Sequence, residues 1–217
     1  MKMKVIWTYS GKIPDKITFE SDWMNRKFVE YLIEDLMKTG RAGDIIIRDE
    51  MDNEWTRKEF LKLNEELEQE PEDIKVYFDG GFDKENALAG LGMVVYYRKG
   101  GEKYRIRKNE KLKELENNNE AEYAALYSCM QLLEELGVRN APCVITGDSQ
   151  VVLKQLEGEW PCYEETLNSW LDRIEAKIKA LGIKPTYEAV SRKQNKEADN
   201  LANQALQDTF IHSHSKY

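Results

Sequence analysis

Histidine and cysteine are scarce in this sequence. The two histidines, His212 and His214, both lie within the last six residues. Mechanisms that need an internal imidazole are therefore excluded, among them Ser–His–Asp and Cys–His catalysis and histidine-rich metal sites. The three cysteines, at positions 129, 143 and 162, are odd in number and form no Cys-x-x-Cys pair. We therefore expect neither a disulfide framework nor a zinc site, and we expect a cytoplasmic location.

Long apolar runs are also missing. The longest are five residues, such as 93–97, so we expect no segment that spans a membrane. The sequence after Met1 is mixed and polar, so we expect no secretory signal. With 41% apolar and 33% charged residues but only 5 Pro and 13 Gly, the composition is that of a folded globular protein. The net charge of −8 excludes a whole-surface electrostatic grip on nucleic acid, although local basic clusters could still bind it.

A charged segment divides the chain. Residues 65–73 read EELEQEPED, and Pro71 in it ends a helix and opens an extended link. We therefore expect a small α+β domain over residues 1–72. Its expected elements are strands at 5–8, 17–19 and 45–48, a helix from Ser21 or Asp22 to about Lys38, and a second helix that begins at a Thr56-x-x-Glu59 capping box.

The order of elements changes after this segment. We expect an α/β domain over residues 73–209 with a mixed five-stranded sheet and helices on both faces, followed by a tail over 210–217. The expected strands are 74–78, 91–97, 103–108, 143–146 and 186–190, and the expected helices are 119–136, 149–156, 163–181 and 196–206.

Four carboxylates occur at informative positions in this second domain. Each has an ordinary structural explanation: Asp79 as a turn residue, Glu122 in a capping box begun by Asn119, Asp148 as a helix N-cap, and Asp199 in a helix first turn. Taken alone, each ordinary explanation is favoured.

Their positions together favour a shared site. Asp79 and Asp148 each follow an apolar strand, and sites in open α/β sheets form at the carboxyl ends of strands. Glu122 continues an apolar helical stripe and so faces inward. Acids that converge without a basic partner repel one another unless cations neutralise them, and hard oxygen ligands select Mg²⁺ or Mn²⁺. Two such ions are the usual apparatus for phosphodiester cleavage.

Four segments around these acids resemble the signature blocks of the type 1 ribonuclease H family, in the family's order and at compatible spacing. They are YFDGG at 77–81, NNNEAEYAAL at 117–126, GDSQVV at 147–152 and QNKEADNLA at 194–202. The resemblance covers residue 74 to about residue 207. It implies a ribonuclease H-like fold for the second domain.

The resemblance also implies site residues and a reaction. Asp79, Glu122, Asp148 and Asp199 match the family's catalytic and metal-binding carboxylates. Gly80, Gly81, Asn118, Asn119 and Gln150 match substrate-contacting positions. The amide side chains would read the minor groove, where the RNA 2′-hydroxyls lie. The implied activity is endonucleolytic hydrolysis of the RNA strand of an RNA–DNA hybrid with two Mg²⁺ or Mn²⁺ ions, giving 5′-phosphate and 3′-hydroxyl ends.

The chain departs from the family pattern at two places. The loop 190–195 has no histidine, and it resembles a subgroup with arginine there, so Arg192 is a candidate for water positioning, product release or a phosphate contact. The basic handle of some family members is absent from the link 157–162, in which we expect Trp160 to cover the core. Residues 98–113 carry eight basic side chains, either as a replacement grip on substrate or, as we favour, as charge that protects an edge strand.

Two other functions stay open: a catalytically inactive nucleic-acid-binding protein on the same fold, and a DNA nuclease of that fold. The first domain has no functional motif. Binding a protein partner, dimerisation, and positioning of hybrid through Arg26, Lys27 and Lys38 stay open for it, and a solvated helix face is favoured.

Overall fold

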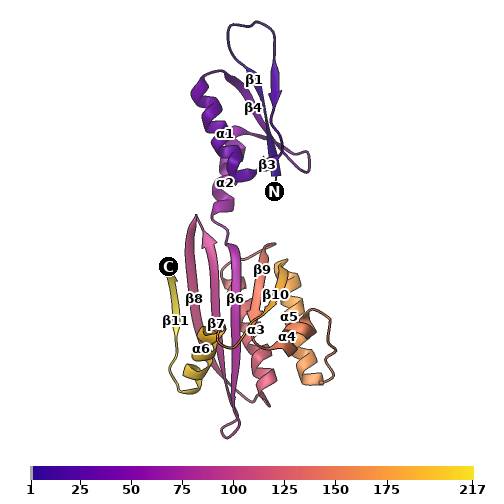
Figure 1. Ribbon diagram of the computed structural model, residues 1–217, viewed down its shortest axis with the longest axis vertical. Coiled ribbons are helices and arrows are strands. Elements are labelled where there is room, and N and C mark those ends of the chain that lie inside the picture. The colour runs from indigo at the N-terminus through magenta and orange to yellow at the C-terminus, as the bar shows by residue number, and fades with distance from the viewer. Residues whose placement is uncertain (1) are drawn as a thin grey trace. The chain divides into compact units, whose positions relative to one another are not determined.

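The computed structural model describes residues 2–217, which form two compact units (Figure 1). The first unit ends at Glu68, and the second covers Gln69–Tyr217. Each has its own hydrophobic core. Glu72, which we expected to close the first domain, is the first residue of a strand in the second unit. None of the helices described over 2–217 is long and apolar enough to cross a membrane.

The first unit has the expected α+β composition. Its elements are β1 (Lys2–Tyr9), β2 (Thr18–Glu20), β3 (Met24–Asn25), α1 (Arg26–Thr39), β4 (Ala42–Asp49), β5 (Glu54–Thr56) and α2 (Arg57–Glu68). The sheet order is β2-β1-β4-β5, and β3 also pairs with β1. The Thr56–Glu59 capping box forms, because the Thr56 N–H donates to Glu59 Oε2 at 2.8 Å and the Glu59 N–H donates to Thr56 Oγ1 at 3.3 Å.

The expected start of the first helix is wrong. Helix α1 is capped by Asn25, whose side chain accepts from the Lys27 N–H at 3.1 Å. Ser21 cannot serve as the cap, because its hydroxyl oxygen accepts from the Val5 N–H of strand β1 at 2.9 Å. The intervening residues form β3 instead, so the chain stays in the sheet for longer than the local sequence indicates.

The second unit is a mixed α/β sheet, as expected. Its elements are β6 (Glu72–Asp83), β7 (Leu88–Lys99), β8 (Glu102–Lys113), α3 (Asn118–Glu135), β9 (Pro142–Gly147), α4 (Gln150–Leu156), α5 (Glu165–Leu181), β10 (Lys184–Ala189), α6 (Lys196–Leu206) and β11 (His212–Lys216). The strand order is β10-β9-β6-β7-β8-β11. Strands β6, β9 and β10 are parallel to one another, whereas β7, β8 and β11 are added in antiparallel fashion.

The sheet has six strands where we expected five. The sixth is β11, formed by residues that we expected to be a tail, and it pairs antiparallel with β8. Its sequence, HSHSK, lacks the apolar alternation that predicts a half-buried strand. Tertiary contacts hold it in place: the His214 ring lies 2.7 Å from the Tyr97 hydroxyl through Nε2 and packs against Tyr104.

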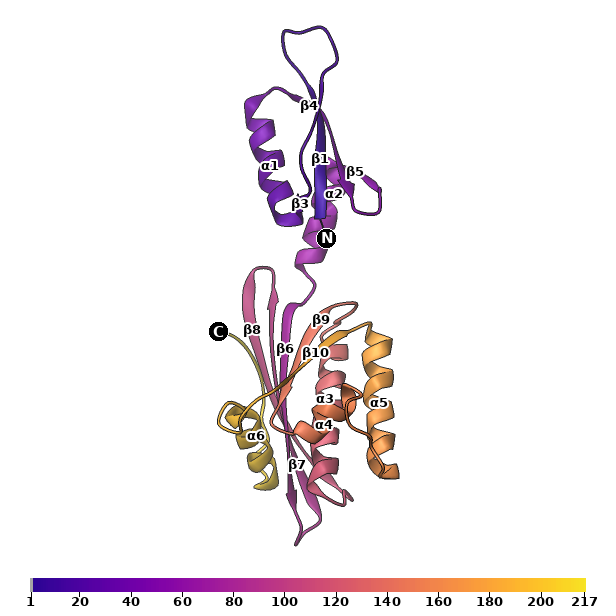
Figure 2. The ribbon, with the colours of Figure 1, turned by 45° about the vertical axis from the view of Figure 1, so that its right-hand side comes forward.

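Helices cover both faces of this sheet (Figure 2). Helices α3, α4 and α5 lie on one face and enclose the larger core, whereas α6 lies on the other. Glycines in β7 allow α6 to approach its backbone. A Cβ on Gly92 would lie 2.0 Å from the Ala198 carbonyl oxygen, and one on Gly90 would lie 2.1 Å from that of Ala202. The start of α6 is thereby brought close to the middle of the sheet.

Candidate active site

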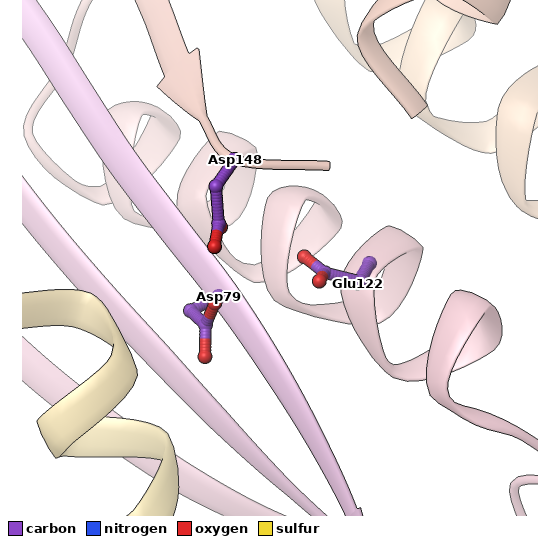
Figure 3. Close-up of side chains that lie close together, drawn as sticks. All are labelled: Asp79, Glu122 and Asp148. Carbon is purple, nitrogen blue, oxygen red and sulfur yellow. The ribbon is translucent and has the colours of Figure 1, made fainter. Parts of the chain in front are cut away.

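Three carboxylates from three elements converge at the centre of the second unit (Figure 3). Asp79 lies within β6, Glu122 lies in the first turns of α3, and Asp148 follows β9 directly. One carboxylate oxygen of each lies within 4.8 Å of the others. Asp79 and Glu122 are buried, at 7% and 8% exposure. The predicted convergence of these three acids is therefore present in the structure.

Sheet register brings Asp79 and Asp148 together. Strands β6 and β9 are adjacent and parallel, and Tyr77 is paired with Thr146. Each aspartate lies two residues beyond its paired residue, so the two carboxylates emerge side by side. Both aspartates lie just past the last pair of the β6–β9 ladder, where sites between parallel strands form. The expectation that Asp79 follows the end of its strand is wrong, because β6 continues to Asp83 through its pairing with β7.

The third acid is placed by the close contact of α3 with β6. A Cβ on Gly80 would lie 2.2 Å from the Ala121 carbonyl carbon and 2.3 Å from the Glu122 nitrogen. Only glycine leaves room for the helix backbone here. Gly80 is therefore required for helix packing, whereas a Cβ on Gly81 would meet its nearest neighbour, Leu206 Cδ1, at 3.4 Å.

Burial and mutual repulsion make the ionised cluster costly. Burial raises the pKa of Asp79 to about 7, and the charges of Asp148 and Asp199 add to the shift. Burial also raises the pKa of Glu122 to about 9, and Asp79 and Asp148 contribute. Oxygen Oε2 of Glu122 is buried and has no hydrogen-bond partner among residues 2–217. A buried carboxylate oxygen of this kind fits a cation ligand, and an all-oxygen donor set suits Mg²⁺ or Mn²⁺.

Asp199 faces the same cavity but is held differently. Its Oδ1 accepts from Nη2 of Arg192 at 2.8 Å. It is not among the three acids whose oxygens all lie within 4.8 Å of one another. Arg192 itself is largely exposed and lines the cavity together with Asp79, Glu122 and Asp148. The guanidinium is thus the cation next to the cluster in this structure.

The three amide residues of the substrate hypothesis lie on the surface of the second unit. Asn118, Asn119 and Gln150 are all exposed, and within residues 2–217 their side chains have no hydrogen-bond partner. Asn118 lines the cavity with Gly80 and Gly81. The helix cap is Asn117, which accepts from the Glu120 N–H at 2.9 Å, so the expectation that Asn119 caps this helix is wrong. The side chains of Asn118 and Asn119 therefore do not cap helix α3.

Asn195 is a site residue that our sequence reading did not select. It is 1% exposed, and its Nδ2 donates to Asp148 Oδ1 at 2.8 Å and to the Phe78 carbonyl oxygen at 2.9 Å. It also lies 3.4 Å from Asp79 Oδ1. The available signal was its place inside the 194–202 segment, four residues before Asp199. The buried Asn195 amide contacts the carboxylates of Asp148 and Asp79 and so fixes their orientation.

The basic segment 98–113 is largely neutralised by carboxylates, most of which belong to other parts of the chain. Its ion pairs are Arg98 with Glu72 and Asp73, Arg105 and Arg107 with Glu197, Lys108 with Glu110, and Lys111 with Asp208. Most of these basic side chains therefore form ion pairs within the fold. The expectation that they protect an edge strand is wrong, because β11 pairs with β8 and forms the edge of the sheet. Trp160 is 46% exposed, so the expectation that it covers the core is wrong.

Comparison with known proteins identifies the family. A family model described as reverse transcriptase-like matches residues 77–205, more than half of the chain. Ribonuclease HI of Halobacterium salinarum is 31% identical over 136 residues, which are 62% of this chain and 65% of that protein. This chain is a ribonuclease H-like protein of the reverse transcriptase-like family.

Other relatives of this ribonuclease H-like protein agree in fold. The crystal structure of RNase H1 from the same archaeon has a TM-score of 0.55 and 29% identity, and it covers 62% of this chain and 98% of that one. LC11-RNase H1 in complex with an RNA/DNA hybrid has a TM-score of 0.56 at 23% identity, over 63% and 98% of the two chains, and shows the fold alone. Uncharacterized protein YpeP of Bacillus subtilis is 48% identical over 198 residues, which are 91% of this chain and 87% of that protein. Similarity to YpeP thus extends into the first unit.

Proposed function

We propose that this protein is an endonuclease that hydrolyses the RNA strand of RNA–DNA hybrids and depends on Mg²⁺ or Mn²⁺. The observation that carries the proposal is the convergence of Asp79, Glu122 and Asp148, with a buried and unpartnered oxygen on Glu122. The names of the ribonuclease HI and RNase H1 relatives support the reaction class.

In this proposal the acids hold two divalent cations. Asp79, Glu122, Asp148 and Asp199 would be the ligands. When bound, the cations supply an activated water and neutralise the charge that develops on the phosphate, and the products carry 5′-phosphate and 3′-hydroxyl ends. The role of Asn195 is to fix the Asp148 carboxylate, which it contacts at 2.8 Å.

Substrate selectivity would come from the exposed amides. Asn118, Asn119 and Gln150 each offer both a donor and an acceptor, so each can pair with a ribose 2′-hydroxyl, which distinguishes RNA from DNA. The backbone at Gly80 and Gly81 lines the same cavity and would face the RNA strand. Arg192, at the cavity opening, would contact the scissile or the neighbouring phosphate.

The test is a cleavage assay with end-labelled RNA in a hybrid, titrated separately with Mg²⁺ and Mn²⁺. Wild-type protein should cut the RNA strand internally, while Asp79→Asn and Asp148→Asn should lose at least about 10³-fold in rate. Asp172→Asn is the matched control, because Asp172 is an exposed acid of α5. All-DNA duplex and double-stranded RNA of the same sequence test selectivity.

Two outcomes would replace the proposal. Tight hybrid binding without cleavage in either metal would indicate an inactive nucleic-acid-binding protein. Degradation of all-DNA duplex from its ends at the rate of hybrid would indicate a DNA nuclease. Near-normal turnover in either aspartate variant would refute the site assignment.

We propose that the chemistry resides in the second unit, residues 69–217, and that the first unit binds a protein or dimerises. The separate cores of the two units support this division. A chain that lacks residues 1–68 should keep the single-turnover cleavage rate and change mainly KM. Loss of single-turnover cleavage in a folded remainder would contradict the division.

A further inference from the structure

Helix α6 covers only part of its face of the sheet. The tight contacts of α6 are made at Gly90 and Gly92 of β7, and in Figures 1 and 2 the helix lies beside one end of the strands. Side chains alternate between faces along a strand. Because Arg105 and Arg107 of β8 bind Glu197 of α6, the odd-numbered residues of β8 lie on the α6 face.

Three tyrosines gather on this face beside the start of α6, and two of them, Tyr77 and Tyr96, pack against the apolar cluster of Val94, Ala198 and Leu201. Tyr77 and Tyr96 meet edge to face at a centroid distance of 5.9 Å, and Tyr96 meets Tyr217 in the same way at 5.4 Å. Tyr77 and Tyr96 are half-buried and Tyr217 is 61% exposed. We call Tyr77, Tyr96 and Tyr217 the tyrosine surface.

Contacts with neighbouring side chains fix the positions of the Tyr77 and Tyr96 rings. The Tyr96 hydroxyl donates to Glu197 Oε2 at 2.7 Å, and the ammonium group of Lys75 lies 5.4 Å from the centre of the Tyr77 ring. A hollow lined by Tyr77, Tyr96 and Asn195 opens beside them. These contacts fix the ring positions, so a ligand would not have to order them.

Two lysines without carboxylate partners flank the tyrosine surface. Lys103 of β8 and Lys184 of β10 are exposed, and within residues 2–217 neither forms an ion pair. Lys184 lies four residues before Glu188 in β10, so the two side chains are on the same face of the sheet. Glu188 binds Lys75 on this face at 2.7 Å. Four strand spacings separate β10 from β8, so the two lysines stand about 19 Å apart across the tyrosines.

The tyrosine surface is also adjacent to the proposed chemistry. Tyr77 lies two residues before Asp79 on the same face of β6, so their Cα atoms are about 7 Å apart. Aromatic rings on an open sheet face, with cations along the path, are the features that bind single-stranded nucleic acid by base stacking and phosphate contact.

We propose that the tyrosine surface, with Lys103 and Lys184, binds a single-stranded nucleic-acid segment that continues from the hybrid in the active site. This inference rests on the proposed function for its substrate. It adds a second contact region, on the α6 face, which binds a single-stranded extension of the hybrid duplex. The ligand is a flexible strand, because a rigid duplex cannot lay its bases on a sheet.

The experiment compares a blunt hybrid with the same hybrid carrying a single-stranded extension, at either end of the RNA or of the DNA strand. Binding to the full chain is measured by fluorescence anisotropy in EDTA, and KM is measured in Mg²⁺. At least one extended hybrid should bind about fivefold or more tightly than the blunt hybrid. Tyr217→Ala and Lys184→Ala should each remove most of this gain and leave the blunt hybrid unaffected.

Controls match the two substitutions. Tyr163→Ala removes a tyrosine that is 89% exposed outside this surface, and Lys179→Ala removes an exposed lysine of α5. Both should keep the gain. Equal affinity for blunt and extended hybrids, or an equal loss on both in Tyr217→Ala, would overturn the inference. Absence of blunt-hybrid cleavage would instead refute the proposed function, so the two failures are distinguishable.

Discussion

The side-chain nitrogen of Asn195 lies 2.8 Å from an oxygen of Asp148, although 47 residues separate them in the chain. The same nitrogen donates to the Phe78 carbonyl oxygen next to Asp79. One buried amide thereby links the start of α6 to the middle of β6 and to the end of β9. Asn195 is a positioning residue, because it acts on the proposed reaction through the carboxylates that it holds.

Replacing Asn195 tests this role. Asn195→Ala should lower kcat for hybrid cleavage about 10–100-fold and weaken Mn²⁺ binding by a similar factor, because the Asp148 carboxylate is no longer oriented. Mn²⁺ affinity is measured by titration calorimetry on folded protein. Asn168→Ala is the control, since Asn168 also donates a side-chain hydrogen bond, to the Cys162 carbonyl oxygen, outside the cluster. Unchanged Mn²⁺ affinity in Asn195→Ala would contradict the role.

The raised pKa of Asp79 predicts how stability depends on pH in EDTA. Well below pH 4, Asp79 is protonated in both the folded and unfolded states. Between pH 4 and about 7, the folded protein keeps a proton that the unfolded chain loses, so the free energy of unfolding falls as the pH rises. Each pKa unit is worth about 1.4 kcal/mol, which makes the loss of the order of 2–4 kcal/mol. Glu122 extends the decline toward pH 9.

Asp79→Asn should remove much of this decline. In urea denaturation at pH 8 in EDTA, the variant should be more stable than wild type, and the difference should shrink at pH 4. Saturating Mn²⁺ should reverse the order, because the cation stabilises only a protein that binds it. Equal stability of Asp79→Asn and wild type at both pH values would contradict the raised pKa of Asp79.

Arg192 supplies the positive charge nearest to the acids, through its 2.8 Å contact with Asp199. Arg192→Ala should lower kcat/KM for hybrid about tenfold or more, because a phosphate contact and the orientation of Asp199 are both lost. Arg192→Lys keeps the charge and should recover part of the activity. Steady-state cleavage in Mg²⁺ measures both variants. Full activity in Arg192→Ala would exclude a role in the reaction.

Gly92 tests the contact that places α6. A Cβ in Gly92→Ala would lie 2.0 Å from the backbone oxygen of Ala198, so the helix must move. We expect a loss of stability of about 3 kcal/mol, measured by urea denaturation, and weaker Mn²⁺ binding, because Asp199 moves with the helix. Gly81→Ala is the control for stability, since its Cβ would meet the nearest atom at 3.4 Å. Equal stability of the two variants would contradict this account.

The amino-acid sequence by itself determined the alternation of strands and helices in the second unit and the inward face of Glu122, because these follow from local periodicity and from the chain order. It did not indicate β11, since an edge strand of alternating serine and histidine is stabilised by its pairing with β8 rather than by its own apolar pattern. Only the tertiary structure decided which hydrogen bonds orient the acids, through Asn195 and Arg192, and where α6 leaves the sheet open. Asn195 meets Asp148 across 47 residues and the Phe78 carbonyl oxygen across 117, and Tyr96 meets Glu197 across 101, and no local pattern encodes contacts over such distances.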